Sequence, residues 1–334
     1  MTVADQIQPS PVVRRRSTSG VFGGVVFGLI VVAVFASLPF TLGTLEVEGV
    51  LDRRYEAGNL ELNLLPPSFS DSRDDEARLA AAQANGAFVP TTFLGTDKLG
   101  RSVLARVLLG GTVSLGIGLA AATIAVTIGT LYGALAGYAG GRTDAAMMRV
   151  VDVLYGLPYI LLVVLMSVAA DGVIARAGLD PSAASRQLVN VATLLVAIGG
   201  VGWLTIARVV RGQVLSLREQ PFMEACRALG LGPQRQFFRH LVPNLIGPIV
   251  VYGALAVPGA ILSESFLSFL GIGVEEPLPS WGNLASEGLN ELNTVKSRWW
   301  LLAWPCLLIG LTLISLNLLG DALKARFDPA DRSP

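Results

Sequence analysis

The sequence predicts an all-α membrane protein with six transmembrane helices and with both termini in the cytoplasm. Of its 334 residues, 52% are hydrophobic and only 15% are charged. Mean hydropathy is +0.59, and charge-free stretches recur that could cross about 30 Å of hydrocarbon as helices of roughly 20 residues. So few charges exclude a disordered chain, a nucleic-acid binder and most soluble enzymes, because they cannot cover the surface of a water-soluble body of this size.

Six apolar segments are long enough to span a bilayer, and a backbone in lipid must form helices to satisfy its hydrogen bonds. The first segment follows three arginines and has no obvious small-residue cleavage site, which predicts a retained anchor helix rather than a signal peptide. The second lies within 35 uncharged residues between Arg106 and Arg142, and the third has only 18 residues. The predicted spans are Val21–Thr44, Thr112–Tyr138, Val153–Ala170, Gln187–Ala207, Leu245–Phe266 and Trp299–Gly320.

The distribution of Lys and Arg sets the predicted orientation, because short cytoplasmic loops carry an excess of both. With the N-terminus inside, 14 of the 25 basic residues fall in the inside segments, which are together shorter than the outside ones. The predicted division is a cytoplasmic tail (1–20), a first helix (21–44), an extracytoplasmic loop (45–105), a core of five helices (106–320) containing a cytoplasmic loop (208–243), and a cytoplasmic tail (321–334).

The extracytoplasmic loop is acidic, with ten Asp or Glu and four Arg between Leu45 and Asp97. Within it, Asp74–Asn85 is rich in alanine and is bounded by Pro66-Pro67 and Asn85-Gly86. Proline and Asn-Gly pairs interrupt regular structure, so this stretch is predicted to be a short helix.

Three glycines in the second span, Gly129, Gly133 and Gly137, are each four residues apart and so share one helix face. A stripe of small residues lets a second helix backbone approach closely, which favours packing in a bundle. The alternative is that glycine is simply common in membrane helices.

The cytoplasmic loop contains an amphipathic pattern, because Phe222, Ala225, Cys226 and Leu229 fall at i, i+3, i+4 and i+7. The segment Gly230–Pro233 is expected to end this helix, since glycine supplies a left-handed cap and proline cannot continue a helix. Such a helix could act as a lever for a docked partner. It could instead lie on anionic lipid, which its arginines would permit.

The residues of this loop resemble the coupling loop of ABC transporter permeases. Glu224-Ala225-Cys226, then Gly230, then Pro243 match its pattern of Glu-Ala-Ala, three residues, Gly, and a Leu-Pro pair thirteen residues on. Three positions depart from the pattern, namely Cys226, His240 and Val242.

The resemblance extends over roughly residues 94–330 and is closest to the C-type permease of the dipeptide and oligopeptide importers, within the type I importer class. The similar segments are Leu94–Arg101, Ala207–Arg211, Glu264–Gly273, Pro279–Asn283 and Asn317–Asp321. The acidic loop before residue 94 is longer than that subfamily leads us to expect, so no role transfers to it.

The resemblance implies a multi-pass subunit of the inner membrane that contacts membrane lipid and works with other chains. These are a sister permease, two ATPase subunits on the cytoplasmic loops and an external solute-binding protein. ATP and Mg would be bound by the ATPases, with no cofactor and no catalytic site in this chain.

Independently, none of the lysines, Lys98, Lys296 and Lys324, follows a glycine, so the chain lacks a Gly-Lys phosphate loop. One histidine and two cysteines leave too few ligands for a zinc or iron–sulfur site.

By this resemblance the ATPase-coupling residues are Phe222, Glu224, Ala225, Cys226, Arg227, Leu229 and Gly230. The apolar side chains would form the surface that the ATPase contacts, with Glu224 and Arg227 at its rim.

Glu264 is the only carboxylate inside a predicted span. Intramembrane acids usually face a cavity or a partner, which makes it a candidate for the translocation path. The alternative for Glu264 is a hydrogen-bonded group near the outer end of its helix.

The expected function is therefore alternating-access import of peptides. Related permeases serve importers of nickel complexes or cell-wall peptides, so these substrates stay open. Two other classes are a gradient-driven secondary transporter and a membrane scaffold. Against the former stand the lack of acids at mid-membrane and of an evident inverted repeat. Against the latter stands the coupling loop, which would then have no purpose.

Overall fold

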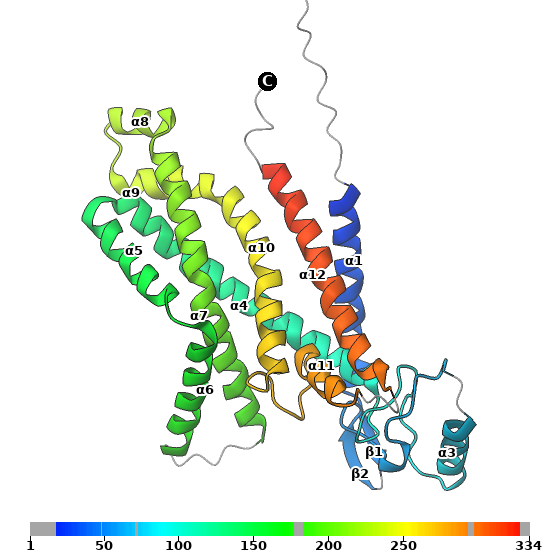
Figure 1. The fold of residues 1–334 in the computed structure, drawn as a ribbon. Coiled ribbons are helices and arrows are strands. Elements are labelled where there is room, and N and C mark those ends of the chain that lie inside the picture. Colours follow the sequence, from blue (N-terminus) through cyan, green and yellow to red (C-terminus); the bar gives the residue numbers. More distant parts are fainter. Residues whose placement is uncertain (1–17, 48, 71–72, 177–182, 293–296, 328–334) are drawn as a thin grey trace, which may run out of the picture.

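The fold is that of a helical bundle with a small folded cap at one end (Figure 1). The computed structural model describes residues 18–47, 49–70, 73–176, 183–292 and 297–327. The predicted N-terminal tail up to residue 17 and the last seven residues of the predicted C-terminal tail lie outside the described residues. The N-terminal end of α1 (Thr18–Ala36), the C-terminal end of α12 (Trp299–Phe327) and helix α8 (Pro221–Ala228) lie at one end of the bundle (Figure 1). The hairpin of β1 (Thr44–Val47) and β2 (Val50–Arg53) and the helix α3 (Arg73–Ala84) lie at the other end (Figure 1).

Five helical segments in the described part of the chain are long and apolar enough to cross a membrane, which confirms five of the six predicted spans. They lie in α1 (Thr18–Ala36) with α2 (Leu38–Thr41), α4 (Val103–Ala139), α7 (Ala183–Arg218), the continuous run of α9 (Pro233–Arg235), η2 (Gln236–Leu241) and α10 (Val242–Phe269), and α12 (Trp299–Phe327).

The third predicted span, Val153–Ala170, is wrong as a continuous helix. The chain forms α5 (Gly141–Tyr155) and α6 (Tyr159–Arg176), which are bent by 86° at the short break between them. Pro158 lies in this break, and proline lacks the N–H and disfavours helical geometry at the residue before it. The two helices make a sixth span only if the bent pair is counted as one.

Two helices are longer than the spans predicted from the positions of charged residues. Helix α4 begins at Val103, nine residues before Thr112, where the Ser102 hydroxyl accepts a hydrogen bond from the Ala105 amide. Helix α7 continues eleven residues beyond Ala207, so a helix rather than a loop carries Arg208, Arg211 and Arg218. Arginine is a good helix former, so the arginines mark the end of the apolar segment and not the end of the helix. Each of them has a partner on α5 or α4.

The glycine stripe of α4 lies directly against α7. A Cβ on Gly133 would lie 2.3 Å from the Ala207 carbonyl oxygen, and one on Gly129 would lie 2.7 Å from the Trp203 carbonyl oxygen. On Gly137 it would lie 2.9 Å from the Val214 Cβ. No side chain fits at these distances, so the three glycines set how closely the two helices approach.

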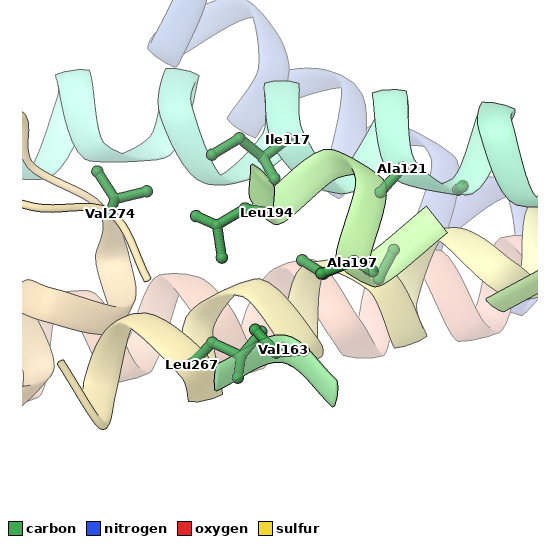
Figure 2. Close-up of a cluster of buried hydrophobic side chains, with 10 residues drawn as sticks. Ile117, Ala121, Val163, Leu194, Ala197, Leu267 and Val274 are labelled. Atoms are coloured by element: carbon green, nitrogen blue, oxygen red, sulfur yellow. The ribbon is translucent and has the colours of Figure 1, made fainter. Parts of the chain in front are cut away.

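A buried apolar cluster joins α4, α6, α7 and α10 in the middle of the bundle. Figure 2 shows the labelled side chains that meet there: Ile117, Ala121, Val163, Leu194, Ala197, Leu267 and Val274. Alanines of α4, α7 and α10 leave space that larger side chains of the neighbouring helices fill, so four helices share one core.

The predicted extracytoplasmic loop folds into the cap. Strands β1 (Thr44–Val47) and β2 (Val50–Arg53) pair antiparallel, and η1 (Leu60–Leu62) and α3 (Arg73–Ala84) follow. Helix α3 confirms the short helix predicted at Asp74–Asn85. The buried Thr96 hydroxyl donates to the Leu62 carbonyl oxygen at 2.6 Å and accepts from the Leu65 amide at 2.8 Å, which attaches the cap to the segment leading into α4.

Helix α11 (Trp281–Asn290) was not predicted. Its N-terminus is a capping box, in which the Ser280 hydroxyl accepts from the Asn283 amide and the Asn283 side chain accepts from the Ser280 amide. The Trp281 side chain is fully buried and its indole N–H donates to the Val107 carbonyl oxygen at 3.0 Å. This pairing locks α11 onto α4.

We expect Gly133→Ala to destabilise the purified protein in detergent by about 1–3 kcal/mol, because the new methyl group overlaps a backbone oxygen that cannot rotate away. Gly116→Ala, on the same helix, is the matched control, since a Cβ there meets nothing within 4 Å. Thermal unfolding followed by circular dichroism measures both, and equal midpoints would contradict the packing role of the stripe.

Candidate functional site

Helix α8 (Pro221–Ala228) is a short surface helix at the end of the bundle opposite the cap (Figure 1). Pro221 occupies its first position, where the missing N–H costs nothing and the fixed φ suits a helix. The helix follows α7 after only two residues, so its start is tied closely to the end of that span.

The end of α8 is closed by a left-handed glycine. Gly230 has φ of +69°. The Leu231 amide donates to the Cys226 carbonyl oxygen at 3.1 Å, and the Gly230 amide donates to the Arg227 carbonyl oxygen at 3.0 Å. This is the paired hydrogen bonding of a Schellman motif, and it confirms the predicted termination at Gly230.

The predicted apolar face of α8 is only partly buried, because some of its residues face the bundle and others are exposed. Cys226 is only 6% exposed and Met223 is fully buried, whereas Leu229 is 78% exposed. Phe222 is partly buried against the apolar cluster that contains Met223. Phe222 and Cys226 therefore face the bundle, on the same side of the helix as Met223. The outward side presents Glu224, Ala225, Arg227, Ala228 and Leu229.

A set of hydrogen bonds attaches α8 to the ends of two spans. The Arg227 guanidinium donates to the Arg218 carbonyl oxygen at 2.7 Å, at the last residue of α7. The Arg218 guanidinium in turn donates to the Gly137 carbonyl oxygen of α4 at 2.8 Å. The Tyr138 hydroxyl donates to the Pro233 carbonyl oxygen at 2.8 Å, beyond α8. The helix and the turn after it are thus fixed to α4 and α7 together.

The return from α8 into the membrane passes through a π-helical turn. The segment η2 (Gln236–Leu241) has this geometry and runs without a break into α10. Leu241 is fully buried beside Met223, in the same cluster. A π turn re-aims side chains within a helix, and such turns are frequent at functional sites.

A cavity of about 490 Å³ lies between α4, the α5–α6 junction, α7 and α10. It shares Ala121, Ala122, Ile198 and Ala260 with the buried apolar cluster, and the rest of its lining extends along the helices toward the α8 end. The cluster therefore closes the cavity on the side of the cap. The described lining includes no charged side chain, and its hydroxyl groups are those of Tyr155, Thr205, Tyr252 and Ser263.

Glu264 does not line this cavity. It is completely buried, and its carboxyl oxygens accept from the Ser268 hydroxyl at 2.8 Å and the Ser265 hydroxyl at 3.3 Å. The hydroxyls of Ser114 on α4 and Ser280 before α11 interact with the same group. The carboxyl group is surrounded by hydroxyl donors at the junction of α4, α10 and α11, so this structure supports the hydrogen-bonded alternative over a place in the translocation path.

A buried ion cluster at the cap end was missed by sequence reasoning. The Arg106 side chain, 1% exposed, donates to both carboxylate oxygens of Glu287 at 2.9 and 3.0 Å and to Asp97 at 2.6 Å. The Arg101 guanidinium donates to Asp97 at 2.6 Å and to Glu276 at 3.3 Å. The cluster joins the segment before α4, α4 itself, α11 and the loop before α11.

The pKa values of the two glutamates of this cluster are shifted in opposite directions. Burial raises the pKa of Glu287. Burial acts in the same sense on Glu276, but a hydrogen bond from Glu287 and the charges of Arg101 and Arg106 outweigh it and lower the pKa of Glu276 to about 2.

Other polar contacts were also missed because they join residues far apart in sequence. The only available signal for α11 was the spacing Ser280-x-x-Asn283, typical of a capping box. Asp144 and Asp152 of α5 pair with Arg211 and Arg208 of α7. Among the described residues, no group of three or more His, Cys, Asp or Glu side chains could hold a metal ion.

Comparison with known proteins relates residues 129–332 to a family described as the inner membrane component of binding-protein-dependent transport systems. The chain is 42% identical to the oligopeptide transport system permease protein OppC of Haemophilus influenzae over 240 residues, 72% of this chain and 71% of that protein. It is 42% identical to the dipeptide transport system permease protein DppC of Bacillus subtilis over 237 residues, 71% of this chain and 68% of that one.

The OppC protein of Escherichia coli K12 is 41% identical over 269 residues, 80% of this chain and 82% of that protein. Among solved structures, an inward-facing form of the MetNI methionine ABC transporter superposes with a TM-score of 0.51. It is 16% identical in sequence and covers 67% of this chain and 97% of that one, so this likeness concerns the fold.

We expect Gly230→Ala to loosen the end of α8 by about 1–2 kcal/mol, because an L-residue is strained at a positive φ. A Cβ there meets nothing within 4 Å, so the effect isolates backbone strain. Gly232→Ala is the control, because its Cβ is equally free and its φ is −63°. Amide hydrogen exchange across residues 221–231 measures the difference, and identical protection in both variants would contradict the cap.

Proposed function

This chain belongs to the family of inner membrane components of binding-protein-dependent transport systems, and we propose that it is the permease subunit of an ATP-driven ABC importer for dipeptides or oligopeptides. The observation that carries the proposal is α8, a short helix with one buried and one exposed side, capped by Gly230 and bonded to the ends of two spans. The names of the curated relatives favour peptides over nickel complexes.

The exposed side of α8 would be the surface on which an ATPase subunit docks. Ala225 and Leu229 offer a small apolar area there, with Glu224 and Arg227 beside it. Phe222, Met223 and Cys226 hold the opposite side in the bundle, so a force applied to α8 reaches the spans instead of rotating the helix. Gly230 contributes by ending the helix, not by touching the partner.

The energy source in this proposal lies in other chains. Two ATPase subunits bind ATP and Mg and hydrolyse the nucleotide, and this chain holds no catalytic group. A sister permease completes the pathway beside the cavity, and an external solute-binding protein delivers the peptide at the cap end. Lipid covers the remaining faces of the spans, which expose apolar side chains such as Leu131, Leu165 and Leu311.

Alternating access follows from the position of the cavity. In the described conformation the apolar cluster separates the cavity from the cap, and the cavity lies toward α8. Displacement of α8 by the ATPases would move the closely packed pair of α4 and α7 away from α10 at the cluster and open the cavity toward the binding protein. The uncharged lining suits passage of peptides with different side chains.

The sidedness proposed for the chain places α8 and both termini in the cytoplasm and the cap outside. It rests on the excess of Lys and Arg in the predicted inside segments. The arrangement of the helices is compatible with it, since the start of α1, the end of α12 and α8 lie at the same end of the bundle (Figure 1).

We expect Ala225→Asp to release the ATPase subunits, because docking would desolvate the new charge at a cost of several kcal/mol. Ala325→Asp is the matched control, as Ala325 is an exposed alanine on α12, away from α8. Co-purification of the ATPases and of a second permease from detergent extracts measures both variants. Full retention of the ATPases by Ala225→Asp, with uptake preserved, would assign α8 to the membrane surface instead.

The orientation is tested by labelling single cysteines in a Cys226→Ser, Cys306→Ser background. We expect Ala77→Cys on α3 to react with an impermeant maleimide in intact cells and Ser216→Cys on α7 to react only after permeabilisation. Both positions are exposed, so access depends on the side of the membrane. The reverse pattern would overturn the orientation inferred from the arginines.

A further inference from the structure

Helix α5 is held between two breaks in the chain. At its start, Gly140 and Gly141 have φ of +67° and +57°, which turns the chain sharply out of α4. At its end, the break before α6 bends the chain by 86°. A helix with a break at each end can move as one rigid piece, because only a few backbone angles need to change.

The far end of α5 forms part of the cavity wall. Leu154 and Tyr155 close the helix, Leu157 follows in the break, and all three line the cavity. A small rotation of α5 about its glycine joint would therefore change the width of the cavity. Its position depends on whatever holds it to the rest of the bundle.

Apolar packing holds α5 only weakly. The buried residues of the helix are Asp144 and Val151, whereas Val150 and Val153 are 50% and 62% exposed. One buried valine contributes about 1.5–3 kcal/mol at most. Polar contacts must therefore hold α5 in its position against the bundle.

Two ion pairs attach α5 to α7. The Arg211 guanidinium donates to both carboxylate oxygens of Asp144, through Nε and, at 2.6 Å, through Nη2. The Asp144 side chain is 10% exposed and that of Arg211 is 34% exposed, so this two-point contact is partly shielded from water. The second pair, Arg208 with Asp152 at 2.9 Å, is more exposed. The Arg208 guanidinium also lies 4.2 Å above the ring of Tyr155, which belongs to the cavity wall.

The same turns of α7 lead to α8. Arg218, seven residues after Arg211, bonds to Gly137, three residues before the glycine joint, and its own carbonyl oxygen accepts from Arg227 of α8. A displacement of α8 thus acts on the end of α7 and on the end of α4 at once. Helix α5 is bound to α7 by ion pairs, and to α4 through two glycines and the Tyr132 hydroxyl, which donates to the Met147 carbonyl oxygen at 2.9 Å. It must therefore move with the closely packed pair of α4 and α7.

We propose that α5 transmits the movement of α8 to the cavity wall, with Arg211 and Arg208 as positioning residues that act through Asp144 and Asp152. The proposal rests on the proposed function, since it requires α8 to be moved by a partner. In this proposal, the ion pair between Asp144 and Arg211 fixes the start of α5 to α7. The contacts of Arg208 with Asp152 and the Tyr155 ring fix the other end of α5.

The experiment uses the whole importer, permease with its partner subunits and binding protein, in vesicles of phosphatidylethanolamine and phosphatidylglycerol. Uptake of radiolabelled trialanine and ATP hydrolysis are measured on the same vesicles. We expect Asp144→Arg to lower peptide taken up per ATP by about tenfold or more, because a two-point charged contact is replaced by repulsion. The double variant Asp144→Arg with Arg211→Asp should recover most of that ratio.

Asp152→Asn provides a milder variant that keeps the fold, and its effect should not exceed about fivefold because exposed pairs contribute about 0–1 kcal/mol. Arg149→Gln is the matched control on the same helix, at an exposed position, and it should leave the ratio unchanged. ATPase subunits should co-purify with all of these variants.

Three outcomes would overturn the inference: an unchanged uptake per ATP in Asp144→Arg and Asp152→Asn, no recovery in the double variant when it inserts as wild type does, or an equal loss in Arg149→Gln. If the unmodified importer fails to retain the ATPases or to take up the peptide, the proposed function itself fails. Because the ratio compares uptake with hydrolysis in one sample, a merely lower amount of folded protein does not change it.

Discussion

The close contact between α4 and α7 is the constraint on which the rest of the bundle depends. Gly129, Gly133 and Gly137 leave no room for a side chain, so the backbones of the two helices touch along three turns. In lipid, such packing supplies attraction that the hydrophobic effect does not supply between helices. The contact brings Arg211 and Arg218 of α7 to the end of α4, where α5 begins and where α8 is attached. Moving either helix outward would remove the wall of the cavity and the support of α8 together.

The burial of α8 differs between its two sides, one held against the bundle and the other exposed, where we propose that a partner docks. Met223 and Cys226 face the bundle, and Ala225 and Leu229 face outward. A helix that only rested on lipid would turn all of its apolar residues to one surface, whereas this one divides them between two. The π turn after it and the glycine cap at its end then fix its direction relative to α10. These features fix the direction in which α8 leaves the bundle.

Buried polar groups serve structure at the other end of the molecule. Glu264 is surrounded by serine hydroxyls where three helices meet, and Arg106 binds carboxylates from the segment before α4 and from α11. Removing one partner from such a cluster leaves a buried charge without compensation, which typically costs about 3–5 kcal/mol. The clusters therefore define the geometry of the cap end, and the cavity lies elsewhere, with an uncharged lining.

The sequence by itself determined the membrane class, five of the spans, the short helix of the cap and the helix that ends at Gly230, because apolar length, helical spacing and glycine caps act over a few residues. It also placed the glycine stripe on one face of a helix. It could not determine the continuation of α7 through its arginines, the inward side of α8, or the groups that surround Glu264. Those depend on partners distant in sequence: Asp144 allows Arg211 to stay in a helix, the cluster around Leu241 turns Met223 and Cys226 inward, and Ser114 and Ser280 surround Glu264. Only tertiary structure brings such residues together, since charge and polarity in a sequence do not say which group will meet them.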